Sequence, residues 1–257
     1  MKRVLAGALA AATLITASPA QAAVDPVKAL KKQLVAGHGV KVSETDRATS
    51  SDHKTDATFR MTGVLEFGAS GIVASDFTVR YVSRKRKADP MPMRWVSVGR
   101  DIYLQSTSGL PEGKTWVHLD LRGPLISFQP TDLSRPVVLK GLIAHAKTAK
   151  AGVYRGSITQ EQVRRLNGKS GTGFAYRLDI GPKGLPERLI TDEKLDFGTY
   201  GWMRDAVTTR YTDWGTKVTI KAPPEEQVVD SKDLTGAAFD ELMEEIKSIP
   251  DGALAHR

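Results

Sequence analysis

Strict alternation of apolar and polar side chains constrains the fold of this chain more than any other feature. Phe174, Tyr176, Leu178 and Ile180 are separated by single residues that are small or charged. A period of two places successive side chains on opposite faces of a β-strand, whereas an amphipathic helix needs apolar positions three and four residues apart. The pattern recurs along most of the chain, so we predict a sheet with one apolar face and one polar face.

The alternation predicts about ten strands, joined mostly by short turns. The first two are residues 55–63 and 73–81, with a hairpin turn at residues 68–71. The others are residues 93–98, 101–106, 114–120, 152–159, 173–180, 187–194, 204–213 and 217–221. Long runs with short turns favour an antiparallel meander over a parallel α/β sheet. Pro223 and Pro224 end the last strand, because proline cannot donate to a ladder of hydrogen bonds.

Two or three helices accompany these strands. Asp25 and Pro26 are typical of a helix start, and a helical apolar stripe follows them up to Leu34. Residues 136–147 and 160–166 also have helical spacing. The predicted class is therefore α+β. A strongly curved, partly closed sheet around an apolar hollow needs few covering helices, and so does a filled β-sandwich; periodicity does not separate the two.

The N-terminus has the layout of a secretory signal peptide. Lys2 and Arg3 precede an uncharged stretch, residues 4–17, that is too short to cross a hydrocarbon core of roughly 30 Å. A small-x-small cleavage site, Ala20-Gln21-Ala22, comes next. We therefore expect residues 1–22 to be removed and the protein to be secreted, acting in the cell envelope or the medium.

Positive charge distinguishes the remaining chain. Residues 23–257 hold 35 basic and 29 acidic side chains, a net charge of +6. A secreted protein rarely meets nucleic acid, so we expect no nucleic-acid partner. The charge suits peripheral contact with an anionic membrane or an envelope polymer, or it serves solubility alone.

The most basic stretch lies between two predicted strands. It consists of Arg84, Lys85, Arg86 and Lys87 and is followed by two methionines beside prolines. Four consecutive cations do not fit a buried ladder, so this is a loop with an apolar tip. We interpret the four cations as a contact for an anionic headgroup or membrane, the alternative being a solvated loop.

Residues 231–257 form a separate C-terminal segment beyond the main domain, residues 23–230. Apolar side chains from Ala238 to Ile249 follow helical spacing, and acidic side chains occupy the other side. An acidic amphipathic helix is therefore expected. A core helix is the default role for such a stripe, and the alternatives are a lid on a cavity or a partner-binding helix.

No residue pattern indicates catalysis. The chain has no cysteine, no Gly-x-Ser-x-Gly elbow and no two histidines closer than fifteen residues. Paired carboxylates for acid–base work are also absent from the sequence pattern. We therefore predict a protein that is not an enzyme and that has no catalytic residue, no metal site and no cofactor.

Several segments resemble the LppX/LprG-type envelope lipoproteins of actinobacteria. Residues 151–158 (AGVYRGSI) are similar to a v-x-Y-x-G strand of that family. Residues 113–120 (GKTWVHLD), which follow an Ile-Tyr-Leu strand at 102–104, look like its gk-x-W-v-x-i-d strand. Residues 174–188 are similar to a w-l-D…g-l-p-x-r hairpin, and residues 211–224 (YTDWGTKVTIKAPP) to the closing Y-x-d-f-G-x-x-v-x-i-x-a-P-p. As an ordered set, these matches span residues 55 to 230.

The resemblance implies a fold similar to the periplasmic carriers LolA and LolB. That fold is an unclosed antiparallel β half-barrel lidded by helices, with a hydrophobic cavity for acyl chains. The family has no catalytic residues to transfer. Two features depart from it: the lipid-anchor cysteine is missing, so we expect a released protein, and the acidic segment after Asp230 is additional.

We therefore predict a secreted, non-enzymatic carrier that binds a lipid or another hydrophobic small molecule. The alternative is a protein-interaction or sensor module with a filled core and no lipid cargo, whose protein partner the sequence does not name. A hollow of several hundred Å³ distinguishes the first from the second. The expected ligand contacts lie on the apolar strand face: Phe59, Met61, Phe77, Val79, Tyr81, Val117, Leu119, Phe174, Tyr176 and Leu178.

Overall fold

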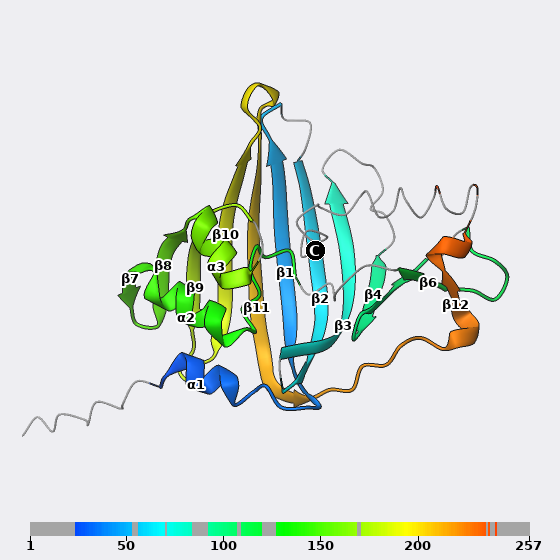
Figure 1. Cartoon of the computed structure of the whole chain (residues 1–257), viewed down its shortest axis with the longest axis horizontal. Helices are drawn as coiled ribbons and strands as arrows, with labels where there is room; N and C mark the ends of the chain where they lie inside the picture. Colours follow the sequence, from blue (N-terminus) through cyan, green and yellow to red (C-terminus); the bar gives the residue numbers. More distant parts are fainter. Residues whose placement is uncertain are drawn as a thin grey trace, which may run out of the picture.

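A single sheet of 12 strands dominates the structure (Figure 1). The computed structural model describes residues 24–52, 56–69, 71–83, 92–106, 109–119, 127–168, 171–234, 236 and 240. The strands are β1 (His38–Ser50), β2 (Asp56–Gly68), β3 (Gly71–Ser83), β4 (Met93–Val98), β5 (Asp101–Gln105), β6 (Trp116–Leu119), β7 (Ala146–Lys150), β8 (Val153–Ile158), β9 (Phe174–Ile180), β10 (Pro186–Asp196), β11 (Trp202–Lys217) and β12 (Val228–Asp230). Their order is β12-β6-β5-β4-β3-β2-β1-β11-β10-β9-β8-β7, and all pairs except β6–β12 are antiparallel.

Two meanders build this sheet. Strands β1 to β6 follow one another in sequence and in space, and so do β7 to β11. The two runs meet where β1 pairs with β11, and we call this pair the seam. The outermost strands, β7 and β12, do not pair with each other, so the sheet stays open. The predicted α+β class with an unclosed, mostly antiparallel sheet is confirmed.

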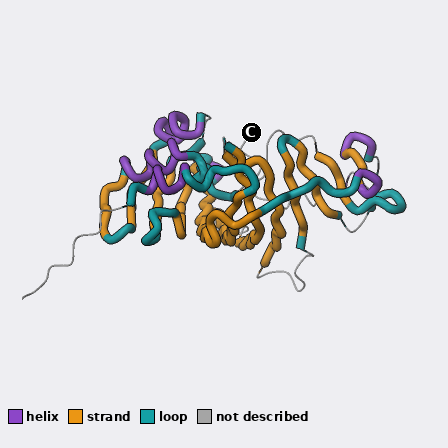
Figure 2. Tube along the Cα trace, turned by 90° about the horizontal axis from the view of Figure 1, so that it is seen from below, coloured by secondary structure: helices purple, strands orange, loops and turns teal. Residues whose placement is uncertain are grey.

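Three helices lie on one side of the sheet, over the second meander (Figures 1 and 2). They are α1 (Pro26–Lys31), α2 (Pro136–Ala144) and α3 (Gln160–Asn167). Asp25 caps α1 as expected, because its side chain accepts hydrogen bonds from the backbone N–H groups of Val27 and Lys28. At α3, Thr159 and Gln162 form a reciprocal capping box, and Gly168 ends the helix in the left-handed conformation.

Several element predictions need correction. β1 was not expected, and it supplies one half of the seam. Residues 146 and 147, expected to end the helix at 136–147, instead begin the edge strand β7. The strand expected at 204–213 belongs to the longer β11, which ends at Lys217, and residues 218–221, expected to form a further strand, are not in a strand. The three-residue strand β12 adds to the far edge, so the sheet has 12 strands, where about ten were predicted.

Some predictions concern parts of the chain outside the described residues. These are the signal peptide (1–22), the basic stretch Arg84, Lys85, Arg86 and Lys87, and most of the acidic C-terminal segment. Within the part of the chain that the structure does describe, no helix combines the length and the apolarity needed to span a membrane.

Candidate ligand-binding face

Strand register shows which side chains share the face covered by the helices. The hydroxyl of Tyr176 donates a hydrogen bond to the carbonyl oxygen of Leu142 in α2, so Tyr176 points to the helix side. Residues directly opposite on paired strands project to the same face. From Tyr176 the pairing continues across the sheet through Thr191, Val207, Asp46, Phe59 and Tyr81. We call this the inner face.

The first meander presents an apolar inner face, which we call the apolar wall. One row runs straight across it, from Phe77 through Trp95 and Leu104 to Val117. All four side chains are at most 1% exposed. The wall consists of Phe59, Met61, Phe77, Val79, Trp95, Leu104, Val117 and Leu119. The indole Nε1 of Trp95 is buried and has no hydrogen-bond partner among the described residues, so one polar donor remains unused in this wall.

The ten predicted contact residues all lie on the inner face, in two groups. Six of them belong to the apolar wall, and Tyr81 packs against Phe59 at its end, with ring centroids 5.0 Å apart. The other three, Phe174, Tyr176 and Leu178, lie on β9 within the helix-covered half. Burial raises the pKa of Tyr176 to about 12, which keeps its hydroxyl as a donor to α2. The structure therefore places the β9 group in the packed core under the helices. Whether any of the ten touches a ligand stays a prediction.

A polar band separates the two groups and follows the seam. Glu44 on β1 is 1% exposed and accepts hydrogen bonds from Ser127 Oγ, Phe128 N and Thr209 Oγ1. Burial raises the pKa of Glu44, and these three donors offset part of that rise. The side chain of Gln129 extends the band by bonding to Thr209 and Thr191.

Three further carboxyl groups continue this band along the same face. Asp46 lies two residues beyond Glu44 on β1, and Asp205 on β11 lies directly opposite Glu193 on β10. Asp46 is 1% exposed, and its Oδ1 has no hydrogen-bond partner among the described residues. Burial, with the nearby charges of Asp205 and Glu44, raises the pKa of Asp46 to about 8. Burial also raises the pKa of Glu193.

Sequence reasoning missed the polar band because of its composition. Inward positions of β1 are Val40, Val42, Glu44, Asp46 and Ala48, so acidic residues occupy places where an apolar residue marks a strand. The alternation is present, but it is an alternation of burial and not of hydropathy. One signal could have revealed this strand: every second residue from Lys41 to Arg47, the outward positions of β1, is polar.

The inner face encloses little free space. A cavity of about 10 Å³ lies between β1, β2, β11 and the segment 127–135, bordered by Val42, Phe67, Leu133 and Tyr211 among others. Such a volume holds about one water molecule. In this conformation the described interior is therefore close to filled, and an acyl chain needs the covering segments to separate from the sheet.

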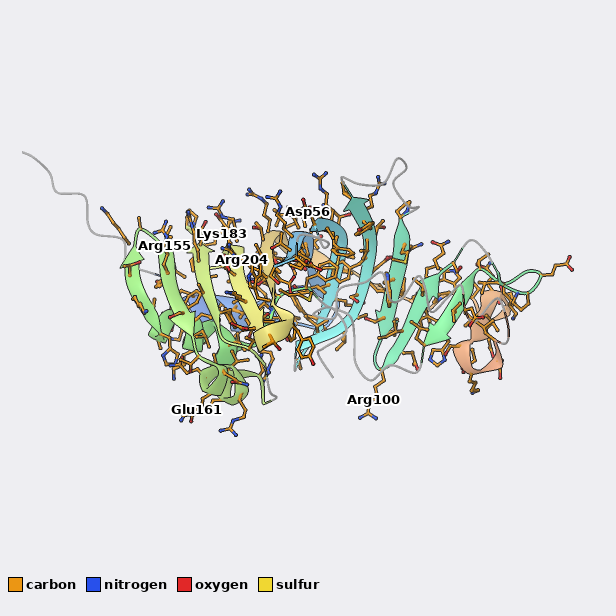
Figure 3. All side chains as sticks on the ribbon, turned by 90° about the horizontal axis from the view of Figure 1, so that it is seen from above. Asp56, Arg100, Arg155, Glu161, Lys183 and Arg204 are labelled. Atoms are coloured by element: carbon orange, nitrogen blue, oxygen red, sulfur yellow. The ribbon has the colours of Figure 1, made fainter. Side chains whose placement is uncertain are left out.

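The opposite, outer face is polar and rich in arginine. Arg60 and Arg80 lie directly opposite each other on β2 and β3, both exposed, and neither forms an ion pair with any described residue. Figure 3 shows Arg155 and Arg204 projecting from this side, away from Glu161 on α3 and from Arg100. His118 on β6 also lies on the outer face, between the inward Val117 and Leu119. It contacts two carboxylates there, Asp101 at 3.2 Å and Asp230 at 3.3 Å.

Metal chemistry finds no support in the described side chains. They contain no group of three or more histidine, aspartate or glutamate side chains placed to hold a metal ion.

Solved structures similar to this chain include the following two. One is the lipoprotein LppX of Mycobacterium tuberculosis, 13% identical, with a TM-score of 0.42 over 76% of this chain and 96% of that one. The other is a LolA superfamily protein of Nitrosomonas europaea, 10% identical, with a TM-score of 0.28 over 78% of this chain and 94% of that one. The likeness is one of fold. Both names are those of the groups that the sequence motifs resemble. No family model and no curated protein matches the sequence.

Proposed function

We propose that this protein binds one lipid or another apolar small molecule against the apolar wall, as a non-catalytic carrier outside the cytoplasm. The observation that carries this proposal is the buried Nε1 of Trp95, which has no hydrogen-bond partner among the described residues and lies within an otherwise apolar row of four strands. An apolar core has no use for an orphaned donor, which costs free energy when buried. An ester or hydroxyl oxygen of a bound lipid would accept that hydrogen bond.

Desolvation of the acyl chain supplies the affinity in this proposal. Each buried methylene contributes about 0.8 kcal/mol, so a chain of a dozen methylenes gives on the order of 10 kcal/mol before ordering costs. Part of that gain is spent in uncovering the wall, because its side chains are at most 5% exposed in this conformation. In this proposal the protein exchanges between the packed conformation and an opened one, and the ligand binds the opened conformation.

Native mass spectrometry of the mature protein, purified gently from its own host, tests the proposal. Adducts of lipid mass that organic extraction removes are the expected result. After extraction, the protein should take up the neutral fluorescent hydrophobe N-phenyl-1-naphthylamine. A clean apo mass together with no uptake of the probe would refute the carrier.

The filled interior favours one second candidate, a protein-interaction or sensor module without cargo. Its support is the near absence of free volume beneath the segment 127–135. The same two measurements separate the candidates, because a module with a fixed core takes up neither lipid nor probe.

The arginines of the outer face are candidates for a surface that contacts membranes. Exposed arginines opposite each other on neighbouring strands repel one another and are favourable only where an anionic partner neutralises them. We propose that Arg60 and Arg80 contact anionic membrane lipids while cargo is exchanged. This contact would act beside the stretch 84–87, which follows directly after β3.

A further inference from the structure

The seam carries an acidic site that the binding of a neutral lipid does not use. Asp46, Asp205 and Glu193 project from three adjacent strands onto the inner face. Asp205 and Glu193 are directly opposite each other, and Asp46 is diagonal to Asp205. Like charges directly opposite on paired strands are destabilising unless something neutralises them.

Glu44 and Asp46, two residues apart on β1, differ in the hydrogen-bond donors around their carboxyl groups. Both are buried inner-face acids on β1, each 1% exposed. Glu44 has three donors arranged around it, from Ser127, Phe128 and Thr209. The Oδ1 of Asp46 has none within the described chain. The fold thus satisfies both oxygens of Glu44, whereas Asp46 accepts a hydrogen bond from the backbone of Arg47 and keeps its Oδ1 without a donor among the described residues.

The surroundings of Asp46 indicate what kind of donor fits. Its direct neighbours across the strands are Val207 and Phe59, and Phe59 begins the apolar wall. The Oδ1 of Asp46 needs a hydrogen-bond donor, and the apolar neighbours favour a hydrocarbon group beside it. A nitrogen cation with N–H donors meets both requirements, because it forms a charge-assisted hydrogen bond and carries an apolar tail. Asp205 and Glu193 are only partly buried, so the cation reaches Asp46 from their side.

We infer that the inner face binds amphiphiles with a cationic amino group, the nitrogen donating a hydrogen bond to Asp46, with Asp205 and Glu193 adding negative charge nearby and the chain lying along the apolar wall. This inference rests on the proposed function and specifies its ligand class. The titratable groups that face Asp46 are Glu44 on its own strand, Asp205 on β11 and Glu193 on β10, and all are acidic. A bound ammonium group therefore stabilises the ionised form of Asp46 and displaces its proton to solvent, so the affinity for the amine rises as the pH approaches about 8, the raised pKa of Asp46.

Three ligands with the same twelve-carbon chain test the inference: dodecylamine, dodecanol and dodecanoic acid. Each is titrated at pH 8, below its micellar concentration, against full-length protein loaded with N-phenyl-1-naphthylamine. Dodecylamine should displace the probe at a concentration about tenfold or more below that of dodecanol, as a buried charge-assisted hydrogen bond requires. Dodecanoic acid should be the weakest of the three.

The variant Asp46→Asn should remove the advantage of the amine and leave dodecanol unchanged. Asp213→Asn is the matched control, since Asp213 is an exposed acid paired with Lys41 away from the inner face, and it should keep the advantage. If Asp46→Asn does not fold, the variant Glu193→Gln replaces it in the test, because Glu193 is only partly buried, and this variant should also reduce the advantage of the amine. Equal displacement by amine and alcohol would overturn the inference while the carrier proposal stands. Failure of the probe and of all three ligands to bind would overturn both.

Discussion

Asp46 is a buried acid whose Oδ1 has no hydrogen-bond partner among the described residues, which makes it the most consequential single residue in the described chain. Its burial between Val207 and Phe59 keeps the carboxyl group protonated at neutral pH, since its pKa is raised to about 8. In the unfolded chain the same group ionises near 3.8, the ordinary pKa of an aspartate side chain. Between these two values the folded state holds a proton that the unfolded state has released, so the free energy of unfolding falls as pH rises.

The variant Asp46→Asn should therefore be more stable than the wild type at pH 7, and the difference should grow from pH 5 to pH 8. The slope that disappears is at most about 1.4 kcal/mol per pH unit, the value for one proton. Glu44 and Glu193 also have raised pKa values and leave a residual slope of the same sign. Urea unfolding at several pH values measures it. An unchanged slope in Asp46→Asn would show that Asp46 is ionised in the folded protein.

At the scale of the element, β12 shows how a short strand is held. Val228–Asp230 pairs in parallel with β6 and has only three residues, too few for any periodic signal in the sequence. Its last residue, Asp230, also contacts the ring of His118, which in turn stacks against Tyr103 with ring centroids 5.4 Å apart. Tertiary contacts, and not local propensity, therefore fix this edge of the sheet.

Replacing His118 should loosen β12. His118→Ala removes the contact with Asp230 while leaving the apolar inner side of β6 intact, so amide hydrogen exchange of residues 226–231 should accelerate several-fold. His145→Ala is the matched control, because His145 contacts Gln162 in α3 and lies far from this edge. Equal exchange in the two variants would mean that backbone pairing alone holds β12.

Elements with apolar alternation could be predicted from the sequence, and the others could not. β4 was placed with its correct limits, and β9 and α3 to within a residue, because their inward side chains are apolar or their caps are explicit. β7 has no buried side chain, so its sequence shows no apolar alternation. In β1 two of the inward residues are acids, so the hydropathy does not alternate although the burial does. The same reason divides the candidate site: the apolar contacts were predicted, whereas the polar band around Glu44 depends on pairing between distant strands.

On the scale of the whole molecule, the two faces of one sheet carry opposite chemistry. The inner face is apolar with an acidic band, and the outer face presents arginines such as Arg60 and Arg80. Figure 3 shows the labelled basic side chains Arg155 and Arg204 on the outer side. A carrier of this form would approach a membrane with its outer face while keeping its ligand on the other side of the sheet.

Vesicle sedimentation tests this orientation. The double variant Arg60→Gln, Arg80→Gln should bind phosphatidylglycerol-containing vesicles on the order of tenfold more weakly or worse, since each surface cation contributes about 1 kcal/mol. Arg100→Gln with Arg164→Gln removes the same charge from the other side and should have little effect. The difference should shrink at high salt and vanish on pure phosphatidylcholine. Equal losses in both double variants would mean that net charge, and not this face, governs binding.

The seam has a consequence for how the chain is assembled. Every donor that reaches Glu44 comes from the second meander or from the segment that leads into it, whereas Glu44 itself belongs to the first. The β1–β11 junction therefore resembles a dimer interface enclosed within one polypeptide, with a buried acid as its central anchor. If the chain is cut between β6 and the segment 127–135, the two fragments should associate with each other. Glu44 on one fragment would then accept its hydrogen bonds from donors on the other.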